Sequence, residues 1–223
     1  MEQFAMEPFE YVVVITSLII GLGIAQVLNG LADIVSGFKH LKVSVAHVLM
    51  IISTFLNLYQ DWFYNYEYSV HVEEWTMKVI LGLLTFPILV FILARMLIPT
   101  GLRSDEKDLV AYYNEQWPSF FIISIWIVLI SIFQDIHISG IPISEQIPKI
   151  VLIATYSAFL IFKIQNRWAH IIFQALFLIG MITFILVTDI PLIQSIQKAK
   201  TQEIKQENQK PAIDALQSIV NKH

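Results

Sequence analysis

The chain has 223 residues, of which 56% are hydrophobic and 14% are charged, whereas an average soluble protein is about 25% charged. A mean hydropathy of +0.65 is more apolar than a soluble core of this size needs, so we predict an all-α membrane protein. The net charge of −4, without a dense Lys/Arg patch, argues against nucleic acid as a partner. The absence of cysteine excludes disulfides, thiolate metal sites and cysteine nucleophiles.

The first apolar segment, residues 11–35, is long enough as a helix to cross a hydrocarbon core of about 30 Å. One side of this helix combines small residues at intervals of seven with three polar residues, namely Thr16, Gly23 and Gly30 with Gln26, Asn29 and Asp33. Small residues let another helix approach closely, and amides in lipid need partners. We therefore expect the other helices to pack against this side.

Five further apolar segments follow, and the predicted spans cover residues 11–35, 43–64, 75–98, 116–136, 147–164 and 168–189. Pro87 should kink the third of them. The fifth is short between Lys149 and Lys163, so a tilted or re-entrant segment is the alternative to a span. Residues 1–190 then form a compact six-helix transmembrane bundle. Residues 191–223 form a polar, partly helical C-terminal tail.

An amphipathic surface segment is predicted between the third and fourth spans. Ser104 followed by two acidic residues indicates a helix start, and Leu109, Tyr112 and Tyr113 give the segment one apolar side. We expect it to lie along the membrane surface.

Basic residues concentrate in the predicted first, third and fifth loops: Lys39, Lys42, Arg95, Arg103, Lys107, Lys163 and Arg167. The positive-inside rule places these loops in the cytoplasm and the N-terminus in the periplasm. The lysines of the C-terminal tail disagree, because six spans would place the tail outside as well.

The second predicted helix carries its own polar row, in which His47, Thr54 and Asp61 are spaced by seven and Asn57 lies on the same side. In an antiparallel hairpin, Asp33 would lie near His47, and the amides of the first helix near Thr54. Polar groups at membrane depth are costly unless paired or hydrated, so we treat both rows as binding or pore candidates. The alternative is that they only fasten the helices together.

Gln134 and Asp135 end the fourth predicted span at the same membrane edge as Asp61, where two carboxylates would concentrate cations. Two solvated helix ends are the alternative. His47 and His170 offer two imidazoles to a haem in principle, but no other feature supports one, and we predict no cofactor and no metal. No nucleotide-binding, serine-hydrolase or zinc-protease motif occurs, so we do not expect an enzyme.

The opening sequence from Glu10 to Leu31, EYVVVITSLIIGLGIAQVLNGL, resembles a broad group of uncharacterised small bacterial multi-pass inner-membrane proteins. The region of His47, the aromatic run Trp62–Tyr64 and the pair Phe86-Pro87 look similar too. The resemblance implies a bacterial inner (plasma) membrane and a six-helix bundle, and it supplies no activity.

We predict a channel or transporter-like protein with a polar intramembrane face on its first two helices and an ion or small solute as its cargo. The alternative is a non-catalytic membrane scaffold or sensor that acts through its tail and the loop between the third and fourth spans. Besides the lipid bilayer, we expect a homo-oligomer, because glycine-bearing faces offer more packing surface than the chain's own helices cover.

Overall fold

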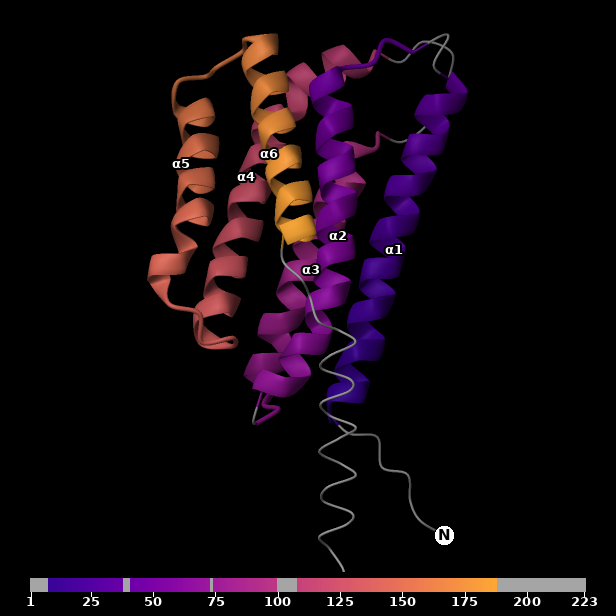
Figure 1. Cartoon of the computed structure of the whole chain (residues 1–223). Coiled ribbons are helices and arrows are strands. Elements are labelled where there is room, and N and C mark those ends of the chain that lie inside the picture. The colour runs from indigo at the N-terminus through magenta and orange to yellow at the C-terminus, as the bar shows by residue number, and fades with distance from the viewer. Residues whose placement is uncertain (1–7, 38–40, 73, 100–107, 188–223) are drawn as a thin grey trace, which may run out of the picture. The chain divides into compact units, whose positions relative to one another are not determined.

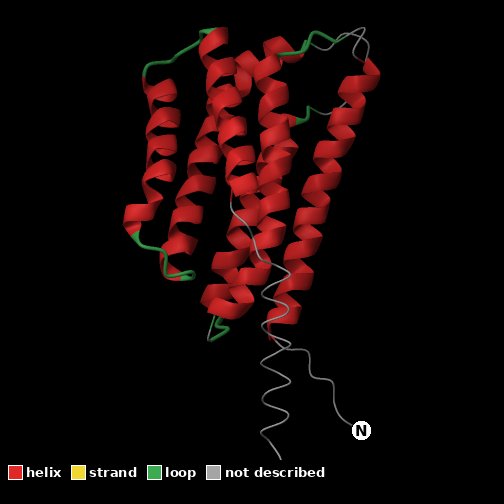
Figure 2. Cartoon of the chain, viewed as in Figure 1, coloured by secondary structure: helices red, strands yellow, loops and turns green. Residues whose placement is uncertain are grey.

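The structure is a computed structural model that describes residues 8–37, 41–72, 74–99 and 108–187. Every regular element in these ranges is a helix (Figure 2). The chain divides into two units, Met1–Met181 and Ile182–His223, and the second is described only over residues 182–187. The predicted C-terminal tail therefore lies outside the described residues.

The described elements are α1 (Pro8–Gly37), α2 (Val45–His71), α3 (Met77–Leu97), α4 (Leu109–His137), the short 3-10 helix η1 (Ile143–Gln146), α5 (Ile147–Ile161) and α6 (Arg167–Val187). Four of them, α1, α3, α4 and α6, are long and apolar enough to cross a membrane, which suggests a membrane location. α2 is long but less apolar. α5 has 15 residues, or about 22 Å of helix, which is shorter than a hydrocarbon core. The all-helical prediction is confirmed, and the described residues form six α-helices, of which four are long and apolar enough to span.

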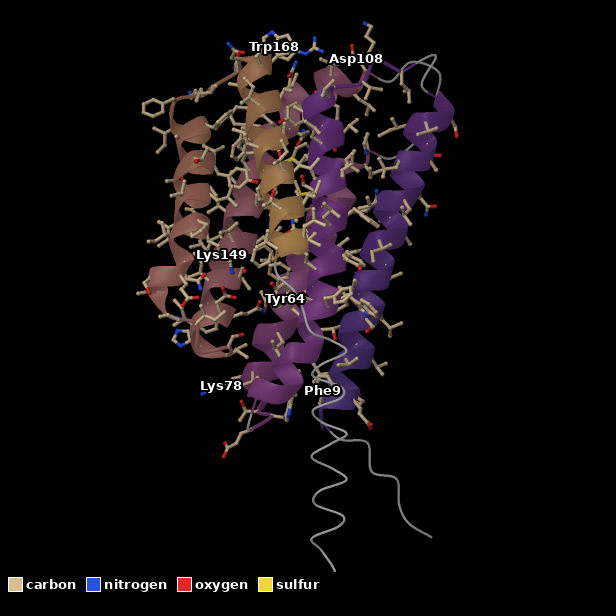
Figure 3. The ribbon with its side chains drawn as sticks, in the orientation of Figure 1. Phe9, Tyr64, Lys78, Asp108, Lys149 and Trp168 are labelled. Atoms are coloured by element: carbon tan, nitrogen blue, oxygen red, sulfur yellow. The ribbon has the colours of Figure 1, made fainter. Side chains whose placement is uncertain are left out.

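Successive helices within residues 8–181 run in alternating directions. α1 packs against α2 and α3, α3 packs against α2 and α4, and α4 packs against α5 (Figure 1). Phe9 and Lys78 lie at one end of the helices, and Asp108 and Trp168 lie at the other (Figure 3). The basic residues Lys42 and Arg95 lie toward the end that Asp108 marks, because Lys42 pairs with Asp108 at 3.4 Å and Arg95 lies in the last turn of α3.

The buried positions of α1 repeat every seven residues and alternate between small and branched side chains: Thr16, Ile20, Gly23, Val27, Gly30 and Ile34. A Cβ added at Gly23 would lie 3.0 Å from both methyl carbons of Leu58 on α2. At Gly30 it would lie 2.6 Å from Cγ1 and 2.9 Å from Cγ2 of Ile98, just beyond α3. The two glycines therefore let the backbone of α1 approach its neighbours closely.

The polar residues of α1 do not share this buried side, contrary to the sequence prediction. Gln26 and Asp33 are half-buried, and Asn29 is exposed. At about 100° per residue, the buried side is centred about 80° from Gln26 and about 140° from Asn29. α1 carries apolar side chains almost all round the helix. Its small residues therefore indicate the side that packs against other helices, whereas its amide side chains do not.

The amphipathic segment that the sequence predicted between the third and fourth spans is, from residue 109 onward, the first part of α4. Asp108 caps this helix, and its Oδ1 accepts hydrogen bonds from the backbone N–H groups of Val110 (2.9 Å) and Ala111 (3.0 Å). The hydrogen bond from Ala111 is the main cause that holds the pKa of the Asp108 carboxyl below its usual value. Leu109 and Tyr113 are buried, which corrects a position on the membrane surface. The predicted start at Ser104 lies outside the described residues.

α5 and α6 are joined by a tight turn. Lys163 has a positive φ of 48°, and the N–H groups of Ile164 and Lys163 donate back to the carbonyls of Phe159 (3.1 Å) and Leu160 (3.4 Å). This is a Schellman motif, which ends α5. Asn166 then caps α6 by accepting a hydrogen bond from the N–H of Trp168 at 2.9 Å. The turn places the first residues of α6 beside α5 and α4.

Candidate functional site

Three of the four polar residues predicted for α2 lie on one buried face of that helix. His47, Thr54 and Asp61 are all buried, and the exposed fraction of Asp61 is only 7%. Asn57 is half-buried and donates its amide N–H to the Ser53 carbonyl of the same helix at 3.2 Å. His47 and Asp61 are separated by four helical turns, or about 21 Å along the axis.

His47 connects α2 to α3 and α4, and its one hydrogen bond among the described residues does not go to α1. Its Nε2–H donates to the Leu97 carbonyl at 2.8 Å, and that carbonyl belongs to the last turn of α3, where helical acceptors lack intrahelical partners. The imidazole also packs against the rings of Tyr112, Tyr113 and Phe120 on α4. At this end of α2, therefore, α3 and α4 supply these contacts of His47.

Three buried hydroxyl groups are satisfied by their own helices, whereas the Ser53 hydroxyl on α2 is buried without a hydrogen-bond partner among the described residues. Thr16 donates to the Val12 carbonyl at 2.7 Å, Thr54 donates to Met50 at 2.9 Å, and Ser124 on α4 donates in the same way. A hydroxyl bonded four residues back needs no partner from a neighbouring helix or from water. Thr54 therefore contributes an oxygen atom to the polar row without a large desolvation cost.

Gln134 contacts α3, not the polar rows of α1 and α2. Its amide N–H group donates to the Gly82 carbonyl at 2.9 Å and lies 3.5 Å from the Leu83 carbonyl. Pro87 has no N–H, so it leaves the carbonyl four residues earlier, that of Leu83, without its helical partner. α3 is continuous through Pro87, and the Gln134 amide supplies part of the missing hydrogen bonding.

Asp135 is paired with a basic residue. This pairing weakens the prediction that two carboxylates at this membrane edge concentrate cations. Lys149 on α5 lies 2.6 Å from the Asp135 carboxylate and also donates to the Ser131 hydroxyl at 2.7 Å. Both charged side chains are partly exposed, so the pair contributes modestly to stability. It also neutralises one of the two carboxylates that the sequence placed at this edge. Lys149 therefore turns from α5 toward α4.

A cluster of aromatic rings joins α4 to the start of α6. Tyr113 and Trp117 on α4 are buried with Phe121, and the His170 ring lies 5.0 Å from Trp117 and 5.6 Å from Phe121. The spacing of four along α4 was a signal for one packed face. Both nitrogens of His170 are hydrogen-bonded, to Tyr113 and to the Ile164 carbonyl, so the ring offers no free ligand to a haem.

The geometry is the only guide to function in this chain. No family model, no curated protein and no solved structure matches it. Within the residues that the structure describes, no group of three or more His, Cys, Asp or Glu side chains is arranged to hold a metal ion.

Proposed function

We propose that the chain is an integral membrane protein whose six helices all cross the bilayer. The outward faces of the helices carry large apolar side chains that a soluble protein would bury, among them Leu18, Leu22, Leu81, Trp126, Ile172 and Leu176. Lipid is the environment in which such faces are stable. α2 then crosses the membrane between its more apolar neighbours. α5 is short, and its span is extended by η1 and by the long side chains of the flanking residues Lys149 and Lys163.

The basic ends support the proposed orientation. Lys42, Arg95, Lys163 and Arg167 flank the ends at which α1, α3 and α5 finish and α2, α4 and α6 begin. The positive-inside rule assigns this side to the cytoplasm of a bacterial inner membrane and the N-terminus to the periplasm. The exposed Asn29 amide on α1 supports a homo-oligomer, because a second copy would cover it.

As the activity, we propose passage of protons or small cations along the buried face of α2. The observation that carries this proposal is the burial of Asp61 and His47 on one side of the same helix, with the Thr54 oxygen between them. Ionisable groups inside a membrane segment are expensive and are retained where they serve transport or proton transfer. Both groups exchange protons, so a proton is the simplest cargo. No enzymatic step belongs to this proposal.

Flux through liposomes tests the activity. The full chain is reconstituted with a pH-sensitive dye inside, and a potassium gradient with valinomycin drives proton entry. We expect Asp61→Asn to reduce the initial rate at least tenfold and His47→Ala to reduce it severalfold. Glu115→Gln, an exposed acid on α4, is the matched control and should retain the wild-type rate. Equal rates in all four proteins, or no flux above empty liposomes, would refute the proposed path.

A membrane scaffold or sensor is the second candidate. It is favoured by the hydroxyls of Thr16, Thr54 and Ser124, which are already bonded within their own helices and therefore do not require a hydrated path. Deletion of residues 194–223 separates the two: a scaffold that acts through its tail loses its partner, whereas a transporter keeps its flux.

A further inference from the structure

A second group of buried polar side chains lies between α4, α5 and the first turns of α6. The His170 ring is buried, and its Nε2–H donates to the Ile164 carbonyl at 2.7 Å. A neutral imidazole then accepts at Nδ1, where the Tyr113 hydroxyl donates at 3.0 Å. The Tyr113 oxygen keeps its lone pairs for a further donor.

Gln174 follows His170 by one helical turn, and its exposed fraction is 0%. Neither its Nε2 nor its Oε1 atom makes a hydrogen bond of good geometry among the described residues, and the polar group that lies beside the amide is the Tyr113 hydroxyl. A buried amide has two donor hydrogens and an acceptor oxygen, and proteins rarely leave all of them unsatisfied.

The remaining surroundings of this amide are mostly aromatic. Rings of Trp117, Phe121 and Phe159 pack against His170 with centroids 5.0–5.6 Å away. Tyr156 is buried nearby and its hydroxyl lies close to Ser124, which donates its own hydrogen to the Phe120 carbonyl. The Tyr113 hydroxyl is therefore the polar neighbour that a small molecule at Gln174 would share.

We propose that Gln174 and Tyr113 bind a buried water molecule between α4, α5 and α6. A stable internal water needs two to four polar partners, and the two polar atoms of the Gln174 amide together with the Tyr113 oxygen supply them. The water completes a hydrogen-bonded chain that begins at the Ile164 carbonyl in the α5–α6 turn and continues through His170 and Tyr113 to Gln174. This site does not depend on the proposed path along α2, and its test uses no flux measurement.

Radiolytic footprinting in H2(18)O tests the site, because hydroxyl radicals formed from a bound water label the side chains beside it. In the full chain in detergent we expect 18O incorporation at Tyr113 and Trp117 despite their burial. Leu83, which is buried on α3 away from the proposed path, should remain unlabelled, and Trp168, which is 69% exposed, should be labelled as a positive control. Absence of label at Tyr113 would overturn the proposal.

The variant Gln174→Met keeps the length of the side chain and removes the amide. We expect labelling of Tyr113 to fall at least fivefold, that of Trp168 to stay constant, and the melting temperature to decrease. An unsatisfied amide without water would give the opposite result, since its removal should leave the melting temperature unchanged or raise it. Tyr113→Phe, which removes a single hydroxyl, should likewise reduce the label at Trp117. Unchanged labelling in both variants would contradict the assignment.

Discussion

Phe121→Ala is expected to lower the free energy of unfolding by about 3–5 kcal/mol, the range for a fully buried phenylalanine. Phe121 is 0% exposed on α4, and five rings pack around it with centroids 4.9–5.9 Å away: those of Trp117, Tyr156, Phe159, His170 and Phe173. These rings come from α4, α5 and α6, so they cannot collapse into the cavity without moving a helix. Unfolding in detergent micelles, followed by circular dichroism, measures the loss.

Phe133→Ala is the matched control, because Phe133 lies on the same helix and is 50% exposed. Among the described aromatic side chains its ring pairs with that of His137, and half of the side chain is exposed, so we expect a loss of about 1 kcal/mol or less. Equal losses in the two variants would mean that the packed side of α4 is assigned incorrectly.

Gly30→Ala is expected to destabilise the protein by about 1–3 kcal/mol, the usual cost of overpacking. The new methyl group would lie within 3.0 Å of both Cγ atoms of Ile98, and a β-branched side chain has few rotamers with which to avoid it. Thermal unfolding in the same micelles measures the effect. The double variant Gly30→Ala with Ile98→Ala should recover much of the loss if this contact is its cause.

Gly21 provides the control for that substitution. No atom lies within 4 Å of the place where its Cβ would stand. Alanine also favours a helix over glycine by up to about 1 kcal/mol, so Gly21→Ala should be neutral or stabilising. A stable Gly30→Ala protein, or an unstable Gly21→Ala protein, would contradict the packing of α1 against α3.

Local patterns in the sequence were sufficient to predict the helices, because apolar runs of this length leave few alternatives for the backbone. The period of seven in α2 also placed His47, Thr54 and Asp61 on one buried face. α1 shows the limit of the same reasoning. Its apolar residues surround the helix, so hydropathy alone does not select a side, and the polar Asn29 was wrongly expected to point inward.

Long-range partners account for the other differences. Nothing local to Gln134 indicates that it will meet the carbonyl freed by Pro87, or that Lys149 will turn toward Asp135. The Tyr113 and Trp117 rings are typical of a membrane interface when read alone. Their burial depends on α6 returning alongside α4, which the short turn at Lys163 produces.

Membrane topology tests the central claim most directly, and the absence of cysteine from the chain makes each introduced thiol unique. Single cysteines replace Lys42, Glu74, Ser144 and Gln165, which are exposed in the α1–α2, α2–α3, α4–α5 and α5–α6 connections. A membrane-impermeant maleimide is then added to right-side-out vesicles. Six spans with the proposed orientation predict labelling at Glu74→Cys and Ser144→Cys, and labelling at Lys42→Cys and Gln165→Cys only after the membrane is opened. Equal labelling of Ser144→Cys and Gln165→Cys from one side would show that α5 does not cross, and equal labelling of Lys42→Cys and Glu74→Cys would show the same for α2.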